Sequence, residues 1–418
     1  MAMEGPAVRA DGRGEGIARA DSARTGAAAH KDGGTRGVGE PWLPFWHRER
    51  PIVGLHESTM SCRRGMPINL RASRLRPTLE AWNPEHDTWP RLEHHGIWVN
   101  RNVLRRAIAR ELTGASVEAG VSTQGYDMWS VMDEPTLDER PDFWRLELVS
   151  RCMTTNTDWQ GEITKVFQTL QRIGETQLTT GCSMHVHVPP SREGNSYKPE
   201  QLHSIMKAVA YFDRAVTAAV PPDRKDNEWA ASNFQKGSCA PRYAELYSNM
   251  SSLTWGPLFQ EFDRIRLPAL IPINVFKNKY VSWNFKHLGS ECGTVEFRRP
   301  PGVKDARSAL YWVAFTLGFL EGAMGHDWSN MKEEKTHGAF LDLRIIIRGG
   351  LKRLGPSCAG IIDNMDDIRE EKSQPTPATR QEKEVIAAKK REKLDKESNF
   401  AVKVNSRPST PASASASS

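Results

Sequence analysis

The sequence of 418 residues lacks the features that mark several large classes of protein. Its longest apolar run, residues 309–320, is shorter than the roughly 20 residues that a helix needs to cross a bilayer. No GxxxxGK[ST] loop is present, which excludes a P-loop nucleotide site. There is no signal-peptide pattern, and acidic residues at positions 4, 11, 15 and 21 are atypical of an organelle transit peptide. We therefore expect an intracellular, cytoplasmic protein with no membrane segment.

Cysteine and unbalanced charge are also scarce. No two of the six cysteines form a CxxC pair, so neither a cysteine zinc site nor a disulfide framework is expected, and the thiols should be reduced. The 57 Lys and Arg residues exceed the 51 Asp and Glu residues by a net charge of +6. Over this length, so small an excess favours a mixed-sign surface rather than a nucleic-acid-binding one. The cysteines are Cys62, Cys152, Cys182, Cys239, Cys292 and Cys358.

Composition divides the chain into three parts. Residues 1–40 are rich in Gly, Ala and Arg and contain few large apolar side chains, which predicts a disordered tail. Residues 371–418 are first charged and then rich in Ser, Ala and Pro, which predicts a second tail with a solvated helix over residues 380–397. Residues 41–370 carry the periodic apolar patterns of one folded domain.

Apolar spacing predicts both helices and strands in this domain. Helical spacing follows capping residues at Asn100 and Asp158, and it also covers residues 200–220 and 304–324, while 341–351 fits a helix or a strand. Alternation predicts strands over residues 128–133, 143–149, 179–188, 280–286 and 294–298. Strands that follow one another with helices between them predict an α+β fold with a largely antiparallel sheet flanked by helices.

The most informative strand contains two histidines. Side chains alternate across a strand, so His185 and His187 share one face while Met184, Val186 and Val188 share the other. Two imidazoles on one face are typical of metal ligands, acid–base groups or ligand contacts. A pair of hydrogen-bonded histidines on a half-exposed strand explains the same pattern.

Two other strands also place ionisable groups two residues apart on one face. These pairs are Arg145 with Glu147 and Glu296 with Arg298. If the three strands are neighbours, they form a polar floor of carboxylates, imidazoles and guanidinium groups. Carboxylates and imidazoles can bind Mg²⁺ or Mn²⁺, and arginine binds phosphate or carboxylate through two hydrogen bonds. This combination indicates phosphate chemistry at a metal ion, with ATP as the phosphate source. Surface ion pairs are the alternative for each pair taken alone.

Several motifs resemble those of the putative amidoligase enzyme family. Residues 182–188 (CSMHVHV) resemble its CGxHVHV signature, and residues 294–298 (TVEFR) resemble its T(V/I)EFR strand. The family's tryptophan–aspartate strand, its E(L/I)VSP strand and its P..R..N segment have counterparts in the same order. These counterparts are Trp129 with Asp133, residues 147–150 with Arg151 in place of proline, and Pro222 with Arg224 and Asn227. The resemblance covers about residues 125–325.

This resemblance implies a glutamine-synthetase-like sheet and ATP-dependent formation of an amide or peptide bond through an acyl phosphate. The partners would be a small-molecule or peptide carboxylate and an amine, and the cofactors ATP and Mg²⁺ or Mn²⁺. Glu147, His187 and Glu296 would bind the metal or Mg-ATP. Arg298 would bind phosphate, His185 would bind phosphate or metal, and Asp133 would position or deprotonate the amine.

One segment departs from the family pattern and supports a second hypothesis. The family opens with a G-x-E-x-E strand, but residues 54–58 read GLHES, with His56 and Ser58 at the two glutamate positions. Glu57 falls between them, on the opposite face of a strand. The alternative is therefore an impaired relative that binds a ligand or partner without catalysis. A metal-dependent hydrolase that uses the two histidines is a third hypothesis, although the other histidines show no supporting spacing.

Overall fold

The computed structural model describes most of the chain between residues 97 and 362 and short segments on either side. The described residues are 51–53, 66–71, 91–94, 97–121, 126–134, 137, 143–190, 196–289, 293–362, 368–371, 379–381 and 383–392, with the backbone alone for 51–101. Contacts divide the chain into residues 1–45 and 46–418, and every described residue lies in the second unit. The predicted N-terminal tail and residues 54–58 lie outside the described part.

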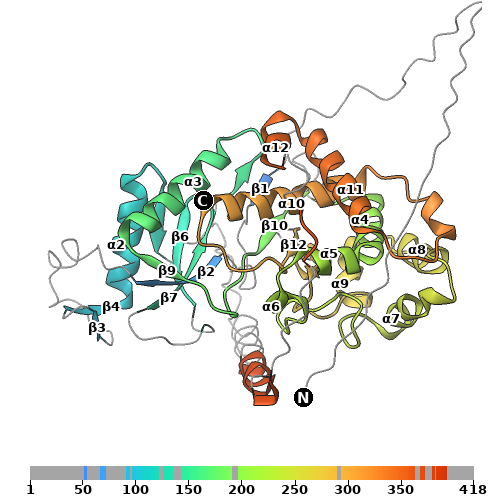
Figure 1. The fold of residues 1–418 in the computed structure, drawn as a ribbon, viewed down its shortest axis with the longest axis horizontal. Coiled ribbons are helices and arrows are strands. Elements are labelled where there is room, and N and C mark those ends of the chain that lie inside the picture. The colour runs from blue at the N-terminus through green and yellow to red at the C-terminus, as the bar shows by residue number, and fades with distance from the viewer. Residues whose placement is uncertain are drawn as a thin grey trace, which may run out of the picture. The chain divides into compact units, whose positions relative to one another are not determined.

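The larger sheet has five strands in the order β5-β6-β7-β2-β9. Only β5 and β6 are parallel among its described pairs, and the other three pairs are antiparallel. Helices α2 and α3 pack with this sheet in one apolar core (Figure 1). The predicted α+β class and the prevalence of antiparallel pairing are therefore confirmed. The strands are β2 (Met66–Arg71), β5 (Ala119–Val121), β6 (Trp129–Asp133), β7 (Trp144–Val149) and β9 (Glu175–Gln177), and the helices are α2 (Arg101–Gly114) and α3 (Trp159–Ile173).

A smaller sheet of three strands, in the order β10-β12-β11, lies against helix α10 (Ala306–Met324). The strands are β10 (Val186–Val188), β11 (Trp283–Asn284) and β12 (Val295–Phe297), and both pairs are antiparallel. Phe297 stacks on Trp283 at 4.3 Å between ring centroids and on Phe315 of α10 at 5.7 Å. Helix α10 lies along this sheet (Figure 1), and the ring stacking buries the apolar face against it, which leaves the opposite face for polar side chains.

Helix α11 (Phe340–Leu354) settles the ambiguous apolar run as helical, and it packs closely on α10. Glycines make this close approach possible. A Cβ atom on Gly350 would lie 2.0 Å from the carbonyl oxygen of Gly318, and one on Gly322 would lie 2.3 Å from that of Ile346. Larger residues at these positions would push the two helices apart.

Three predicted elements differ from the structure. The single helix expected over 200–220 is two helices, α4 (Pro199–Tyr211) and α5 (Asp213–Ala219), which meet at Phe212. The Tyr211 carbonyl accepts a hydrogen bond from the Gly338 amide instead of continuing the helix. The strands expected over 179–188 and 280–286 shorten to β10 and β11, and beside them Ser183 and Val281 form only isolated bridges, to Pro301 and Ala231.

The remaining elements are short, and the charged C-terminal segment is helical over residues 380–381 and 383–392. That helix is not wholly solvated, since Lys390 Nζ bonds to the Glu228 carbonyl and lies over the rings of Trp229 and Tyr280. The other elements are β1 (Pro51–Val53), β3 (Arg91–His94), β4 (Ile97–Asn100), β8 (Met153–Thr154), α6 (Pro222–Lys225), α7 (Pro241–Ser248), η2 (Asn249–Ser251), α8 (Gly256–Asp263), η3 (Pro268–Leu270), α9 (Ile271–Asn274), η4 (Lys286–Gly289), η5 (Asn330–Glu333), α12 (Pro356–Ala359) and η6 (Gly360–Ile362).

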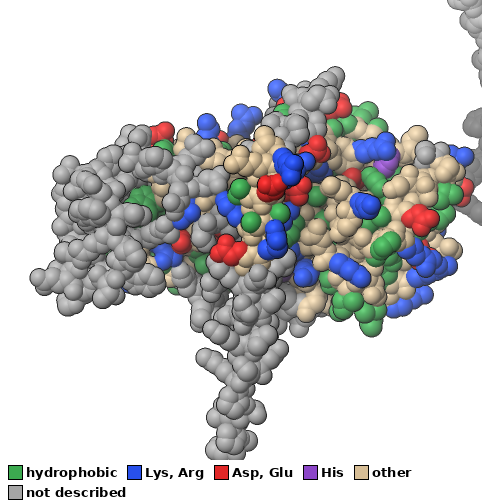
Figure 2. Space-filling view, turned by 90° about the horizontal axis from the view of Figure 1, so that it is seen from below, with side chains coloured by type: hydrophobic (Ala, Val, Ile, Leu, Met, Phe, Trp, Pro, Cys, Tyr) green, Lys and Arg blue, Asp and Glu red, His purple; other side chains and the backbone are tan. Residues whose placement is uncertain are grey.

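The described surface is mixed in character. Figure 2 shows Lys and Arg side chains scattered among Asp, Glu and apolar side chains on one face of the molecule. None of the helices in the described segments combines the length and the apolar character that crossing a membrane requires.

Candidate functional site

The polar face of the three-stranded sheet carries a row of three buried side chains. Glu296 on β12 lies directly opposite His187 on β10 and directly opposite Asn284 on β11. Paired residues in antiparallel strands point to the same face, so the three side chains meet above the sheet. The predicted faces of β10 and β12 and the adjacency of these two strands are confirmed, but the third expected neighbour, β7 with Arg145 and Glu147, lies in the other sheet.

The Glu296 carboxylate is fully buried and accepts two hydrogen bonds, one from a charged group and one from a neutral amide. Arg298 Nη1 donates to its Oε1 atom at 2.7 Å, and Asn284 Nδ2 donates to its Oε2 atom at 2.6 Å. A buried carboxylate is stable only when charge and hydrogen bonds compensate for the lost water. Arg298 supplies the opposite charge directly beside this buried carboxylate.

Three imidazoles surround the same carboxylate. Nε2 of His187 lies 3.4 Å from Oε1, Nδ1 of His185 lies 3.5 Å from Oε1, and Nε2 of His287 lies 3.4 Å from Oε2. The rings of His187 and His287 are 5.2 Å apart between centroids. His185 also pairs through Nε2 with the Ser183 hydroxyl at 3.0 Å. Glu296 is therefore the centre of a cluster that combines one carboxylate, one guanidinium group and three imidazoles.

Part of this cluster has the donor set of a metal site. One ligand atom from each of His187, His287 and Glu296 lies within 4.8 Å of the others, and all three side chains are buried. His187 is held through Nδ1 by the Thr294 hydroxyl at 3.3 Å. Its Nε2 atom is buried and has no hydrogen-bond partner in the described part of the chain. A divalent cation would satisfy this nitrogen, so the residues present fit a metal ion.

His287 is the member of the cluster that the sequence patterns missed. Alternation from Trp283 through Phe285 assigns His287 to the apolar face of a strand. Instead the strand ends at Asn284, and the 3₁₀ turn η4 carries His287 round to Glu296. Asn284 lies on the face that alternation predicted to be polar, but nothing else in the sequence marked it as a site residue.

A pair of buried arginines supports the end of β12. Arg224 donates from Nη2 to the Arg298 carbonyl at 2.9 Å and from Nε to the Arg299 carbonyl at 3.2 Å. In return, Arg299 donates to the carbonyls of Arg224 and Lys225. Burial lowers the pKa of Arg224 to about 10. These hydrogen bonds fix the backbone of Arg298 and therefore the direction of its guanidinium group.

The other predicted site residues lie on the five-stranded sheet. Glu147 is buried on β7, and Asp133 is half-buried at the end of β6. The register pairs Met132 with Glu147 and Asp133 with Leu146, so Asp133 and Glu147 point to opposite faces. Among the described residues, neither Asp133 nor Glu147 belongs to the cluster that could hold a metal ion. The structure thus joins His185, His187, Glu296 and Arg298 and leaves Asp133 and Glu147 apart from each other.

Comparison with known proteins gives one result. A family model described as a putative amidoligase enzyme matches residues 100–320, slightly more than half of the chain. Searches of curated proteins and of solved structures find no match. The matched residues include β6, β7, β10, β11 and β12, which carry the motifs discussed above. The chain belongs to the putative amidoligase enzyme family.

Proposed function

We propose that the protein is a ligase that uses ATP and a divalent cation to join a carboxylate to an amine. The observation that carries the proposal is the buried cluster of His187, His287 and Glu296 with the Arg298 guanidinium 2.7 Å from the Glu296 carboxylate. Family membership supports ligase chemistry. The use of ATP, the binding of the metal and the acyl-phosphate intermediate are parts of what we propose.

The proposed reaction has two steps. In the first, a carboxylate oxygen of the acid substrate attacks the γ-phosphorus of ATP, and the bond to the bridging oxygen breaks to release ADP. In the second, the amine nitrogen attacks the acyl carbon of this acyl phosphate, and inorganic phosphate leaves as the amide forms. The amine loses one proton in the second step. Negative charge on the phosphate oxygens is the quantity that the site must stabilise.

The cluster could stabilise this negative charge with metal ligands and with a guanidinium group. His187, His287 and Glu296 would hold the cation, which when bound neutralises phosphate charge. Arg298 would bind phosphate oxygens, and His185 would bind phosphate or assist as a ligand. A guanidinium so close to a cation site opposes metal binding, and a phosphate bridging the two would offset that repulsion. Metal and nucleotide should therefore bind better together than separately.

The donor set refines the choice of metal. Mg²⁺ prefers oxygen ligands in octahedral geometry, whereas imidazole suits transition metals. Two imidazole nitrogens and one carboxylate oxygen therefore favour Mn²⁺ over Mg²⁺ at this cluster. Mg²⁺ could still enter with ATP as a phosphate-bound ion.

We extend the proposal to the residues of the larger sheet and to the domain. Glu147 is proposed to bind Mg-ATP and Asp133 to position or deprotonate the amine. Their opposite faces mean that a site over one face can include only one of them directly. Residues 41–370 are proposed as the catalytic domain, with the two sheets arranged as in glutamine-synthetase-like ligases.

The test uses the full chain in a thermal-shift assay with MnCl₂ or MgCl₂, each with and without ATP. A rise in Tm that needs both metal and ATP is expected, followed by ADP and phosphate release when pooled acids and amines are added. His187→Gln should abolish the joint shift, while exposed Glu245→Gln should retain it. Tm values that do not respond to the metal–ATP combination would overturn the proposal.

A metal-dependent hydrolase is the second candidate, and one observation favours it. His287 adds a second imidazole to His187 and Glu296, a combination that also suits a metal that activates water. Cleavage of an amide by the Mn²⁺-loaded protein without ATP would select the hydrolase. Binding of nucleotide and metal without ADP release from any substrate pool would select the impaired relative.

A further inference from the structure

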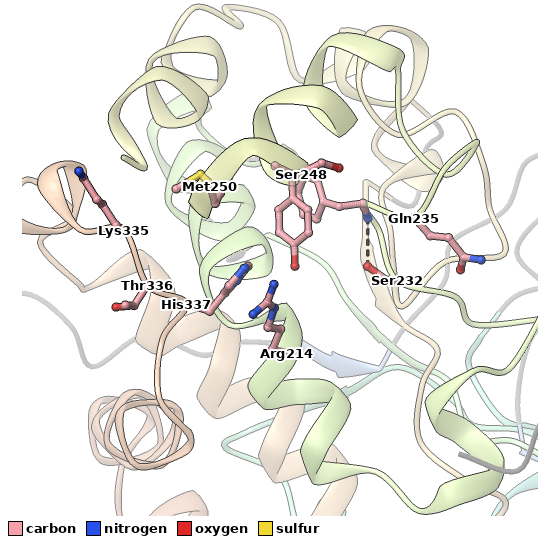
Figure 3. Close-up of a pocket in the computed structure, with 10 residues that line it drawn as sticks. Arg214, Ser232, Gln235, Ser248, Met250, Lys335, Thr336 and His337 are labelled. Carbon is pink, nitrogen blue, oxygen red and sulfur yellow. Dashed lines mark hydrogen bonds between the residues drawn. The ribbon is translucent and has the colours of Figure 1, made fainter. Parts of the chain in front are cut away.

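A cavity lies apart from the cluster around Glu296 and shares no residue with it. It has a volume of about 730 Å³, within the range of roughly 300–1,000 Å³ that is typical of small-molecule sites. Its walls come from α5, the segment 232–235, the end of α7 with η2, and the segment 335–337 (Figure 3). Distant parts of the sequence therefore build one site.

The charged side chains among the described lining residues are all positive. Arg214 and Lys335 line the cavity, and the described lining residues include no aspartate or glutamate. Within the described part of the chain, neither Arg214 nor Lys335 has a carboxylate oxygen within 4.0 Å. In Figure 3, Arg214 and His337 point towards the same space, whereas the Lys335 amine lies on the far side of the view and points away from them. Arg214, which has no carboxylate partner among the described residues, provides a binding potential for an anion on this wall of the cavity.

A buried carboxylate, Asp213, is hydrogen-bonded to two of the residues that line the cavity but does not line it itself. Asp213 is buried and accepts hydrogen bonds from the Ser232 hydroxyl at 2.8 Å and the Tyr247 hydroxyl at 3.1 Å. Burial raises the pKa of Asp213, and the nearby Arg299 charge acts in the opposite direction. Asp213 therefore fixes Ser232 and Tyr247 in place without presenting its own charge to the cavity.

His337 adds a neutral polar group beside Arg214. Its ring lies 5.3 Å from that of Tyr247 and 5.2 Å from that of Trp255, and its Nδ1 atom is buried without a hydrogen-bond partner among the described residues. Burial, followed by the Arg214 charge, lowers the pKa of His337 to about 4, so the ring is neutral at pH 7. The wall segment 335–337 is held by a hydrogen bond from Trp255 Nε1 to the Thr336 carbonyl at 2.8 Å. The wall is thus preorganised.

An apolar surface completes the cavity. Phe234 and Tyr247 stack at 4.4 Å between centroids with an angle of 13° between their planes, and Met250 is buried beside them. A free inorganic ion would leave this surface unused. An organic body attached to the anionic group would bury it.

We propose that this cavity binds a small organic anion that carries a carboxylate or phosphate group. Arg214 holds the charged group, and the Phe234–Tyr247 stack with Met250 packs against the organic part. The proposal rests on the cavity alone and does not depend on ligase activity.

Calorimetric titration of the full chain tests it with four probes: phenyl phosphate, benzoate, inorganic phosphate and the neutral benzyl alcohol. Phenyl phosphate or benzoate should bind, and benzyl alcohol should not. Arg214→Gln should weaken binding by about tenfold or more, since it removes a charge-assisted contact. Lys352→Gln, an exposed cation outside the cavity, should leave binding unchanged. Both substituted side chains are exposed, so the variants should fold, which their Tm values will check.

The outcomes separate the ligand sources and the alternatives. Tighter binding of phenyl phosphate than of benzoate assigns a phosphate ligand, and the reverse order assigns a carboxylate. Equal binding of benzyl alcohol, or equal affinity of the Arg214→Gln variant and the Lys352→Gln control, would overturn the proposal. So would a lack of binding by both organic anions. Because none of these titrations contains ATP or a metal, their failure is distinguishable from failure of the ligase proposal.

Discussion

His187 and Glu296 lie directly opposite each other on neighbouring antiparallel strands, with Nε2 of the histidine 3.4 Å from Oε1 of the glutamate. This pairing joins two motifs that are more than one hundred residues apart in the chain. It places an imidazole beside a buried carboxylate that Arg298 also contacts. The chemistry proposed for the protein depends on this one cross-strand contact.

His287 should contribute directly to metal affinity. His287→Gln removes one of the three donors, and we expect Mn²⁺ affinity to fall by more than the roughly tenfold to 100-fold typical of changes outside the ligand shell. Free Mn²⁺ can be measured by electron paramagnetic resonance during a titration. His326→Gln is the matched control, because His326 lies outside the cluster and packs on Trp328. Equal affinity of the two variants would exclude His287 as a ligand.

Glu296 and Arg298 should show strong energetic coupling. Removing either partner leaves the other charge buried, so Glu296→Gln and Arg298→Met should each lower the free energy of unfolding by about 3–5 kcal/mol. The double variant should lose less than the sum, with a coupling of about 0.5–3 kcal/mol. Urea unfolding of the four proteins measures the cycle. Additive losses would mean that the ion pair does not contribute to stability.

Two adjacent glycines in α11 should respond in opposite ways to the same substitution. Gly350→Ala places a Cβ atom 2.0 Å from the Gly318 carbonyl oxygen, so separating the helices should cost about 1–3 kcal/mol or more. Gly349→Ala meets only the end of the Arg353 side chain at 3.8 Å. It should be neutral or stabilise the helix by up to about 1 kcal/mol. Thermal unfolding of both variants tests the close packing of α10 and α11, which a similar loss in both would contradict.

Stability should fall in mild acid because of His337. Its pKa is lowered to about 4 in the folded protein and is near 6.5 in the unfolded chain. Between these values the unfolded state binds more protons, so stability is lost as pH falls from about 6.5 to 4. Solvent screening of this partly exposed ring limits the effect to about 2 kcal/mol. Urea midpoints measured across this range should depend less on pH in His337→Gln, and an unchanged pH dependence would assign the loss to other groups.

Local patterns were sufficient for much of the framework. Alternation assigned His187 and Glu296 to polar faces and Val186 and Phe297 to apolar faces, because the two-residue period is a property of the extended backbone itself. Asp158 was identified as a helix cap from its position alone, and it accepts a hydrogen bond from the Gly161 amide. The same local rules did not find the break at Phe212, where the competing bond comes from distant Gly338.

The sequence by itself determined the α+β class, the apolar and polar faces of each strand, and the motifs that the family shares. Tertiary structure alone decided that β10 pairs with β12 while β7 joins another sheet, so that Glu147 does not lie in the row with His187. It also brought His287 to Glu296 and formed the cavity around Arg214. Periodicity is set by neighbouring residues along the chain, whereas strand partners and turn-borne ligands depend on contacts between segments far apart in sequence.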